Sequence, residues 1–255
     1  QYRLVAIDPG KPQKENWKVI IPESKNTLES CSYCGGKLFA HYMEDAKSKL
    51  AVFLPDGWPL NPVELPGICS LGSFSGTSDG TTAFYSYSSF NTPGSVYKYN
   101  TETGKSDLFF APQVKFNPDD IVVKQEFYTS KDGTKIPIFI VHRKDIKPDG
   151  TNPAMLYGYG GFNISMSPSF SVSTIFYVEN GGVYAVANLR GGGEYGESWH
   201  QGGTLFNKQN VFDDFIAGAE YLIGSGYTNR DKLSIRGGSN GGLLVGAVTN
   251  KRPDL

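Results

Sequence analysis

Short runs of apolar and aromatic residues, each ended by a turn signal, recur along residues 1–113. The runs that predict β-strands are residues 2–8, 17–21, 37–43, 49–54, 82–87 and 95–100. No amphipathic helix pattern interrupts them, and such regularly spaced short strands favour a sandwich, a barrel or a propeller. At roughly 40–50 residues a blade, a propeller would place about two to three blades here. Because a closed propeller has about four to eight blades, this interpretation implies further blades before Gln1.

The pattern changes after residue 113. Four short apolar strands are predicted at residues 136–141, 154–157, 182–188 and 233–235. Between the last two, residues 211–223 carry apolar side chains at helical spacing. Asp213 and Asp214 fall in the first turn of that helix, where solvated carboxylates suit the helix dipole. Apolar strands that alternate with a helix predict a mostly parallel sheet. We therefore expect all-β propeller blades over residues 1–113 and an α/β domain over residues 114–255, both incomplete.

Composition narrows the classes of partner. Hydrophobic residues make up 39% of the 255 residues and charged residues 19%, which allows a substantial core. The formal net charge is −1 and no long basic run occurs, so neither nucleic acid nor an anionic membrane is expected as a partner. No apolar run is long enough to cross a bilayer.

The cysteines bear on metal binding and on the cellular compartment. Cys31 and Cys34 have the spacing of a zinc or redox pair, but Cys69 stands alone and His41 has no His partner at helical spacing. The favoured interpretation is free thiols in a reducing compartment. We predict no metal, no cofactor and a cytoplasmic location, with the periplasm as the alternative.

The strongest chemical signal is Gly-Gly-Ser-Asn-Gly-Gly at residues 237–242, between a predicted strand and a helix-like run at residues 243–248. Gly-x-Ser-x-Gly in that position is typical of the nucleophile elbow of α/β-hydrolases. Such a turn is sharp and strained, and side chains on the neighbouring residues would clash with the strand and the helix. Positions 237 and 241 must therefore hold small residues, here Gly237 and Gly241. The helix N-terminus behind Ser239 favours a developing anion. A plain glycine-rich turn or a phosphate loop would compete, but the phosphate-loop spacings do not occur.

Acyl transfer by a serine also needs hydrogen-bond donors for an oxyanion. The backbone N–H of Asn240, directly after the serine, is one candidate. The sequence Tyr-Gly-Tyr-Gly-Gly-Phe at residues 157–162 follows a predicted strand, and Tyr159 there offers a hydroxyl. A glycine-rich aromatic turn that only packs would look the same, so position alone leaves both interpretations open.

Three motifs occur together in order: residues 157–162, the sequence Arg-Gly-Gly-Gly-Glu-Tyr-Gly at residues 190–196 followed by Trp199 and His200, and residues 237–242. With Lys-Asp-Gly-Thr-Lys-Ile-Pro at residues 131–137 and Lys-Gln-Asn at residues 208–210, they resemble the prolyl oligopeptidase family. The resemblance is dense from about residue 126 onward and mostly architectural before it. It implies a β-propeller joined to an α/β-hydrolase domain, and a serine endopeptidase that cleaves short peptides after proline.

The resemblance also implies roles for individual residues. Ser239 would be the nucleophile that forms an acyl-enzyme, the Tyr159 hydroxyl and the Asn240 N–H would form the oxyanion hole, and Phe162 would line the proline pocket. The implied partners are short proline-containing peptides, and the complete enzyme would be a monomer. Related oligopeptidases that cut after basic residues usually have Ala at the position of Asn240, and exopeptidase relatives have Trp-Ser-Tyr at the elbow, so both fit less well.

The orienting acid and the general base of an α/β-hydrolase follow the serine along the chain. No His follows Ser239, and Asp254 comes too soon after the elbow to orient a base. We therefore expect the triad Asp and His outside this chain and the chain alone to be inert. His41 and His142 are expected to be structural, and His200 to have a loop or packing role.

Arg190 and Glu194 are expected to hold their glycine-rich loop as a charge-assisted pair. Beside a proline-specific endopeptidase, two alternatives stay open: a non-catalytic propeller–hydrolase module that binds peptides, and an oligopeptidase with another preference at the residue before the cleaved bond.

Overall fold

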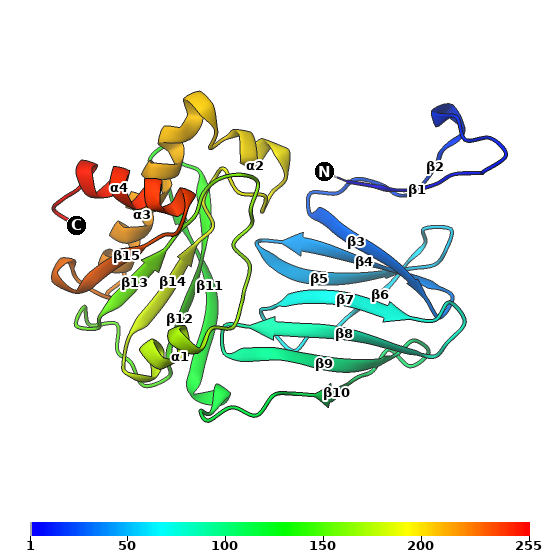
Figure 1. The fold of residues 1–255 in the computed structure, drawn as a ribbon, viewed down its shortest axis with the longest axis horizontal. Helices are drawn as coiled ribbons and strands as arrows, with labels where there is room; N and C mark the ends of the chain where they lie inside the picture. The colour runs from blue at the N-terminus through cyan, green and yellow to red at the C-terminus, as the bar shows by residue number, and fades with distance from the viewer. Residues whose placement is uncertain (1) are drawn as a thin grey trace.

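Separate antiparallel sheets occupy the first part of the chain in a computed structural model that describes residues 2–255 (Figure 1). A two-stranded sheet pairs β1 (Leu4–Ala6) with β2 (Lys18–Ile21). The next sheet has the order β3 (Thr27–Cys34), β4 (Lys37–Glu44), β5 (Lys47–Phe53), β6 (Pro59–Val63). The third contains β7 (Ser70–Gly76), β8 (Thr82–Ser89), β9 (Thr92–Asn100) and β10 (Ser106–Phe110). Each four-stranded sheet joins sequence neighbours in a meander, which is the layout of a propeller blade and confirms the expected blades.

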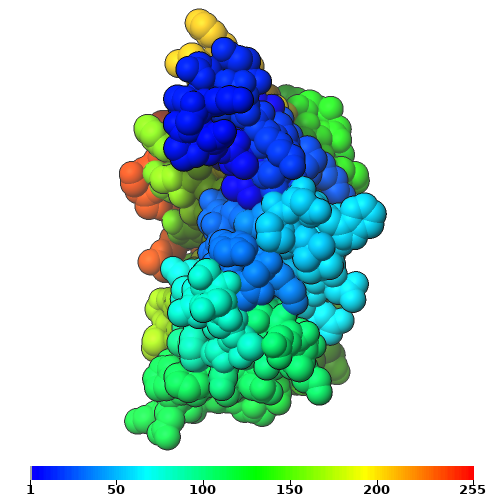
Figure 2. All heavy atoms as spheres, turned by 90° about the vertical axis from the view of Figure 1, so that its right-hand side faces the viewer, coloured from blue at the N-terminus to red at the C-terminus, as the bar shows by residue number. Residues whose placement is uncertain are grey.

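Aromatic side chains fill the space between the two four-stranded sheets, which Figure 2 shows one below the other on the face toward the viewer. Phe39 of β4 stacks on Phe74 of β7 with ring centroids 4.2 Å apart, and Tyr99 of β9 meets Phe39 edge-on. Cys69 is buried in this cluster, and burial raises the pKa of its thiol to about 12. This buried thiol therefore stays protonated and packs as a small apolar group.

The Cys31 and Cys34 pair lies within β3, and both thiols are free. Residues three apart on a strand point to opposite faces of the sheet. The two sulfur atoms therefore face away from each other, and the spacing that resembled a metal or redox pair comes from two alternating strand positions.

In the first part of the chain the hydrophobic pattern missed β3, β6, β7 and β10, and in the second part it missed the strand Ile121–Thr129 and the helix Val172–Glu179. Two prolines fall in β6, where Val63 is the one β-branched residue, and β7 reads Ser-Leu-Gly-Ser-Phe-Ser-Gly, with Phe74 as its one aromatic residue. Both strands therefore have few of the β-branched and aromatic residues that mark a strand. Pairing with neighbours of stronger pattern places these segments in the sheets, because β6 lies beside β5 and β7 beside β8.

A five-stranded sheet forms the second part of the chain. In spatial order its strands are β11 (Ile121–Thr129), β12 (Lys135–Arg143), β14 (Val183–Ala187), β13 (Ala154–Tyr157) and β15 (Leu233–Arg236). β13 is parallel to β14 and β15, and only β12 opposes its neighbours β11 and β14. All strands except β12 therefore run in the same direction, which confirms the predicted mostly parallel sheet.

Helices cover both faces of this sheet (Figure 1). They are α1 (Val172–Glu179), α2 (Glu197–Gln201), α3 (Lys208–Gly224) and α4 (Asn240–Lys251), with 3₁₀ turns at Lys14–Asn16, Pro118–Asp120, Leu205–Asn207 and Arg230–Lys232. The 3₁₀ turn Leu205–Asn207 leads into α3, which therefore begins before the predicted residue 211. Within residues 2–255, no helix is both long enough and apolar enough to cross a membrane.

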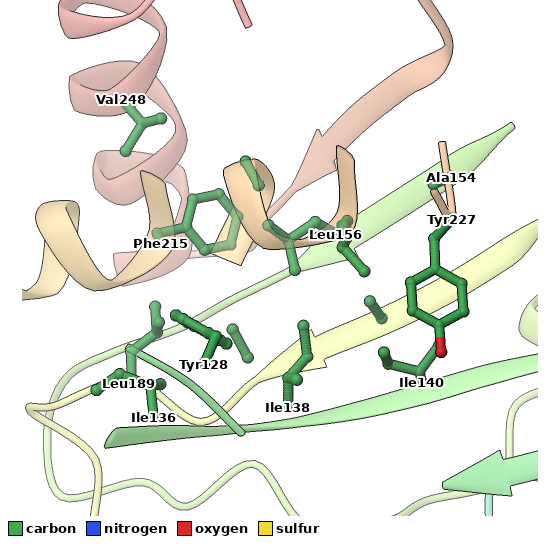
Figure 3. Close-up of a cluster of buried hydrophobic side chains, with 14 of the residues drawn as sticks. Tyr128, Ile136, Ile138, Ile140, Ala154, Leu156, Leu189, Phe215, Tyr227 and Val248 are labelled. Atoms are coloured by element: carbon green, nitrogen blue, oxygen red, sulfur yellow. The ribbon is translucent and has the colours of Figure 1, made fainter. Parts of the chain in front are cut away.

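The main core lies between the sheet and the helices α3 and α4. Figure 3 shows Ile138 and Ile140 of β12 below Phe215 of α3 and Val248 of α4. Phe215 is fully buried, as the helical spacing of the apolar residues predicted. Apolar burial of this kind is the dominant favourable contribution to folding.

The opposite face of the sheet packs against the first part of the chain. Phe139 of β12, whose side chain points away from the main core, belongs to a second cluster with Ile175 of α1. Ala46 and Phe90, from the antiparallel sheets, are buried in the same cluster. The two parts therefore share this hydrophobic cluster.

Polar contacts reinforce this shared cluster. Asp45 lies in the β4–β5 turn, and its carboxylate accepts a hydrogen bond of 2.8 Å from the hydroxyl of Tyr195. Ser70 of β7 donates through Oγ to the carbonyl oxygen of Pro168 over 2.7 Å. Both contacts join the propeller-type sheets to loops that border the carboxyl edge of the larger sheet.

Candidate active site

The loops that follow β13, β14 and β15 leave the sheet at one edge. Tyr157, the last residue of β13, is level with Val186 of β14 and with Arg236 of β15. The carboxyl ends of parallel strands form the usual ligand-binding edge of such a sheet. Residues 158–162, 188–196 and 237–239 gather there, so the three sequence motifs lie side by side.

Ser239 forms a sharp turn between β15 and α4. Its φ is 53° and its ψ is −117°, a conformation that costs a non-glycine residue about 1–3 kcal/mol. A Cβ atom on Gly237 would lie 2.3 Å from the carbonyl oxygen of Gly241, and one on Gly241 would lie 2.7 Å from that of Gly158. The structure therefore confirms that the turn is strained and that both glycines must be small.

The candidate oxyanion donors lie on either side of this turn. Asn240 is the first residue of α4, so its backbone N–H has no acceptor within the helix. Its side-chain amide donates to the carbonyl oxygen of Tyr159 over 2.6 Å. Within residues 2–255 the hydroxyls of Tyr159 and Ser239 form no hydrogen bond. Residues 158–162, the turn after β13, are called the Tyr159 turn. Phe162, at its end, is 72% exposed and has a φ of 55°.

The histidines occupy the predicted structural positions. His41 lies in β4 with Nε2 at 2.8 Å from Ser48 Oγ, and His142 lies in β12. His200 lies in α2, with Nδ1 at 2.9 Å from the carbonyl oxygen of Gly191. That ring supports the glycine-rich loop, as expected. Among residues 2–255, no histidine forms a hydrogen bond with the Ser239 hydroxyl.

Arg190 pairs with Asp214 rather than with Glu194, so the predicted Arg190–Glu194 pair is wrong. The Arg190 Nε donates to Asp214 Oδ2 over 3.0 Å, and Ser130 Oγ donates to the other carboxylate oxygen over 2.6 Å. Arg190 also forms an ion pair with Asp132. Asp214 is fully buried, so the predicted solvated helix start is also wrong for this residue. The ion pair ties the loop after β14 to α3 and to the β11–β12 turn.

Glu194 is a buried carboxyl group that the sequence did not single out in this role. It is 1% exposed, and its Oε1 accepts hydrogen bonds from Met166 N at 2.9 Å and from Asn188 Nδ2 at 3.3 Å. Its Oε2 and the Asn188 Oδ1 have no hydrogen-bond partner among the described residues. Burial raises the pKa of Glu194 to about 6, because an ionised carboxylate loses its hydration there.

A polar cavity of about 310 Å³ lies where these loops meet the first part of the chain. Its lining residues are Tyr2, Thr27, Glu29, Asn163, Ser165, Gly193, Gly196 and Glu197. Over residues 2–255, no group of three His, Cys, Asp or Glu side chains is arranged to hold a metal ion.

The parallel sheet, its helices and the strained turn at Ser239 define an α/β-hydrolase fold joined to propeller-type sheets. The family model of the prolyl oligopeptidase family matches residues 168–255, and the model of the prolyl oligopeptidase N-terminal beta-propeller domain matches residues 1–112. The chain belongs to the prolyl oligopeptidase family, as the sequence motifs predicted.

Curated relatives match nearly the whole chain. The prolyl endopeptidase of Elizabethkingia meningoseptica is 47% identical over 253 residues, which cover 99% of this chain and 36% of the relative. The prolyl endopeptidase of Dictyostelium discoideum is 44% identical over 98% of this chain and 33% of its own length. This chain therefore spans about a third of the length of these relatives.

Solved structures agree with this assignment. A structure from a study of two prolyl endopeptidases superposes with a TM-score of 0.91 at 50% identity, covering 99% of this chain and 37% of that one. A prolyl oligopeptidase B of Galerina marginata, bound to a 35mer hydrolysis and macrocyclization substrate, superposes with a TM-score of 0.88 at 37% identity. That alignment covers 97% of this chain and 35% of the other.

The close approach of Gly241 to the Tyr159 turn predicts an asymmetric effect of two neighbouring substitutions. Gly241→Ala should lower the free energy of unfolding by about 1–3 kcal/mol, because its Cβ overlaps the carbonyl oxygen of Gly158. Gly242→Ala is the matched control, since its Cβ meets nothing within 4 Å, and should be neutral or stabilise by about 0.5–1 kcal/mol. Urea denaturation measures both; equal losses would contradict the packing described here.

The buried carboxyl of Glu194 predicts a pH-dependent stability. Its folded pKa of about 6 lies above the ordinary value of 4.5, so the folded state binds the proton more tightly. The stabilisation of the folded state by this tighter proton binding is fully present below about pH 4.5 and is lost as the pH rises through 6. Glu194→Gln removes the titration and should raise the free energy of unfolding at pH 7, relative to the parent protein, by on the order of 1–2 kcal/mol.

The control for this experiment is Glu197→Gln, because Glu197 is exposed at the start of α2. Denaturation at pH 4.5 and pH 7 gives the comparison. A Glu194→Gln variant whose stability keeps the pH dependence of the parent protein between these values would show that another group is responsible.

Proposed function

We propose that the protein that carries this chain is a serine endopeptidase that hydrolyses short peptides on the carboxyl side of proline. The Ser239 Oγ attacks the carbonyl carbon of the proline residue and forms an ester. The C–N bond to the next residue breaks, and the departing amine takes up the proton that the Ser239 hydroxyl gives up. Water then hydrolyses the ester and releases the acid. The strained turn at Ser239 is the observation that carries this proposal, because an apolar strand-to-helix connection has no structural need for it.

Two neighbouring groups support an acyl-transfer role for this turn. We infer that the Tyr159 hydroxyl and the Asn240 N–H donate to the oxyanion that forms during attack. The Asn240 N–H lies at a helix N-terminus, where the macrodipole favours negative charge. The Tyr159 turn is held against Asn240 by a side-chain hydrogen bond, so both donors belong to one connected structure.

The exposed ring of Phe162 supports a proline pocket beside the turn. A flat aromatic surface that is 72% exposed loses water when an apolar pyrrolidine ring packs on it. We infer that Phe162 contributes to the preference for proline.

We further propose a division of the chain into propeller blades over residues 1–113 and a hydrolase domain over residues 114–255. Short proline-containing peptides are the proposed substrates, and the complete enzyme is proposed to be a monomer. Three free cysteines, two of them buried, suit the reducing environment of the cytoplasm.

Covalent labelling tests the nucleophile. A peptidyl-proline phosphonate should add to the protein that carries this chain at one site, and Ser239→Ala should abolish the adduct measured by intact mass. Cleavage of paired peptides with Pro or Arg before the scissile bond then tests the specificity. Labelling that persists in Ser239→Ala would overturn the nucleophile assignment, and binding of the proline peptide without cleavage would favour the non-catalytic module.

The oxyanion role of Tyr159 predicts a separation of kinetic constants. Tyr159→Phe should lower kcat by about 100-fold or more, since loss of one oxyanion donor costs roughly 2.7–4 kcal/mol in the transition state. KM should change little, because the ground-state carbonyl does not require the hydroxyl. Steady-state kinetics under conditions where acylation limits the rate provide the measurement, and an unchanged kcat would remove Tyr159 from the oxyanion hole.

A further inference from the structure

Lys208, the first residue of α3, reaches from its helix to the turn that carries Tyr159. Its Nζ donates to the carbonyl oxygen of Gly160 over 2.7 Å. The same ammonium group makes a longer contact of 3.4 Å with Asn240 Oδ1. One side chain therefore contacts both the turn after β13 and the helix that begins directly behind Ser239.

Asn240 completes a ring of hydrogen bonds around this contact. While its Oδ1 accepts from Lys208, its Nδ2 donates to the carbonyl oxygen of Tyr159 over 2.6 Å. The three bonds join α3, the Tyr159 turn and α4. Both proposed oxyanion donors, the Tyr159 hydroxyl and the Asn240 N–H, are carried by members of this ring.

The turn needs such external support because of its composition. Gly158, Gly160 and Gly161 leave its backbone with more conformational freedom than any other residue type would. They are also required there: a Cβ on Gly160 would lie 2.3 Å from Val211, and one on Gly161 would lie 2.5 Å from the Asn240 amide. Close packing demands glycines, so other groups must fix the position of the turn.

Lys208 suits this task by its burial and charge. The side chain is half-buried, and burial lowers its pKa because the ammonium loses hydration. Among the described residues it forms no ion pair with a carboxylate. Its donors are therefore committed to the carbonyl of a buried glycine and to an amide oxygen, and hydrogen bonds from a charged donor are roughly twice as strong as neutral ones.

We propose that Lys208 is a positioning residue for the peptidase reaction, which holds the Tyr159 turn against the Ser239 elbow so that both oxyanion donors face one point. The proposal rests on the function proposed above for Ser239. Lys208 itself does not touch the substrate. Its removal leaves the Gly160 carbonyl without its partner and frees the glycine-rich turn to move relative to α4.

The test compares Lys208→Met with Lys251→Met in the complete protein that carries this chain. Lys251 is the matched control, because its Nζ donates to Gln209 over 2.6 Å and links the same helices, α4 and α3, at the exposed surface. Lys208→Met should lower kcat for a proline peptide by about 10-fold to 100-fold, since small misplacements of reacting groups carry penalties of that size. KM should stay close to that of Lys251→Met, and the variant should remain folded at the assay temperature although its melting temperature falls, because a buried carbonyl loses its partner.

A second measurement does not depend on activity. Hydrogen exchange of the backbone amides in residues 157–162 should accelerate in Lys208→Met and not in Lys251→Met. Should Lys208→Met fail to fold, Lys208→Gln, which keeps a single donor group, is measured in the same way with the same expected directions.

The outcomes separate the two proposals. An unchanged kcat, or a loss of kcat with no faster exchange in residues 157–162, would overturn the positioning role of Lys208. Absence of cleavage and of Ser239 labelling in the parent protein would overturn the proposed function, while the exchange data would still decide whether Lys208 holds the turn. Faster exchange together with a lower kcat and an unchanged KM is the result expected.

Discussion

The parallel register of β13 with both of its neighbours is the constraint on which the site depends. Tyr157 ends level with Val186 on one side and Arg236 on the other, so the following loops leave the sheet at the same height. A shift by one residue would invert which side chains of β13 face the core. Ala154 and Leu156 are fully buried between the sheet and its helices, which fixes the register by burial alone. The chemistry at the edge is thus held in place by apolar packing below it.

Buried charge gives the edge its rigidity. The Arg190–Asp214 pair joins the loop after β14 to α3, and Ser130 joins both to the β11–β12 turn. A buried ion pair contributes little net stability compared with apolar residues of the same volume. The pair instead restricts geometry, because several directional hydrogen bonds converge on one guanidinium and one carboxylate. These bonds limit how the loop after β14, α3 and the β11–β12 turn can be arranged relative to one another. Glu194, a few residues along the same loop, forms no ion pair with Arg190 and instead accepts a hydrogen bond from the backbone N–H of Met166.

The sequence predicted most of the elements that have strong hydrophobic periodicity. It also predicted the turn at Ser239, because Gly237 and Gly241 occur where any larger side chain would clash with the backbone. It missed β7, because Gly and Ser carry no strand signal and the strand exists through its pairing with β8. It also missed the partner of Arg190. Asp214 falls between Val211 and Phe215 on the apolar face of α3, and that position could have shown that its carboxylate needs a buried cation. Lys208 was noted only as part of a motif at residues 208–210, and its role could not be predicted, since its contacts depend on how a helix start meets a turn almost fifty residues earlier.

The placement of Ala46 and Phe90 in one cluster with Phe139 has a consequence for the energetics of the whole chain. Separating the propeller-type sheets from the hydrolase sheet would expose the apolar side of β12 to water, at a cost proportional to the area uncovered. Loss of order in either part therefore weakens the other, and heating should melt both in one cooperative transition. A substitution in a blade, far from Ser239, can then lower the fraction of molecules with an intact elbow without altering any atom near it.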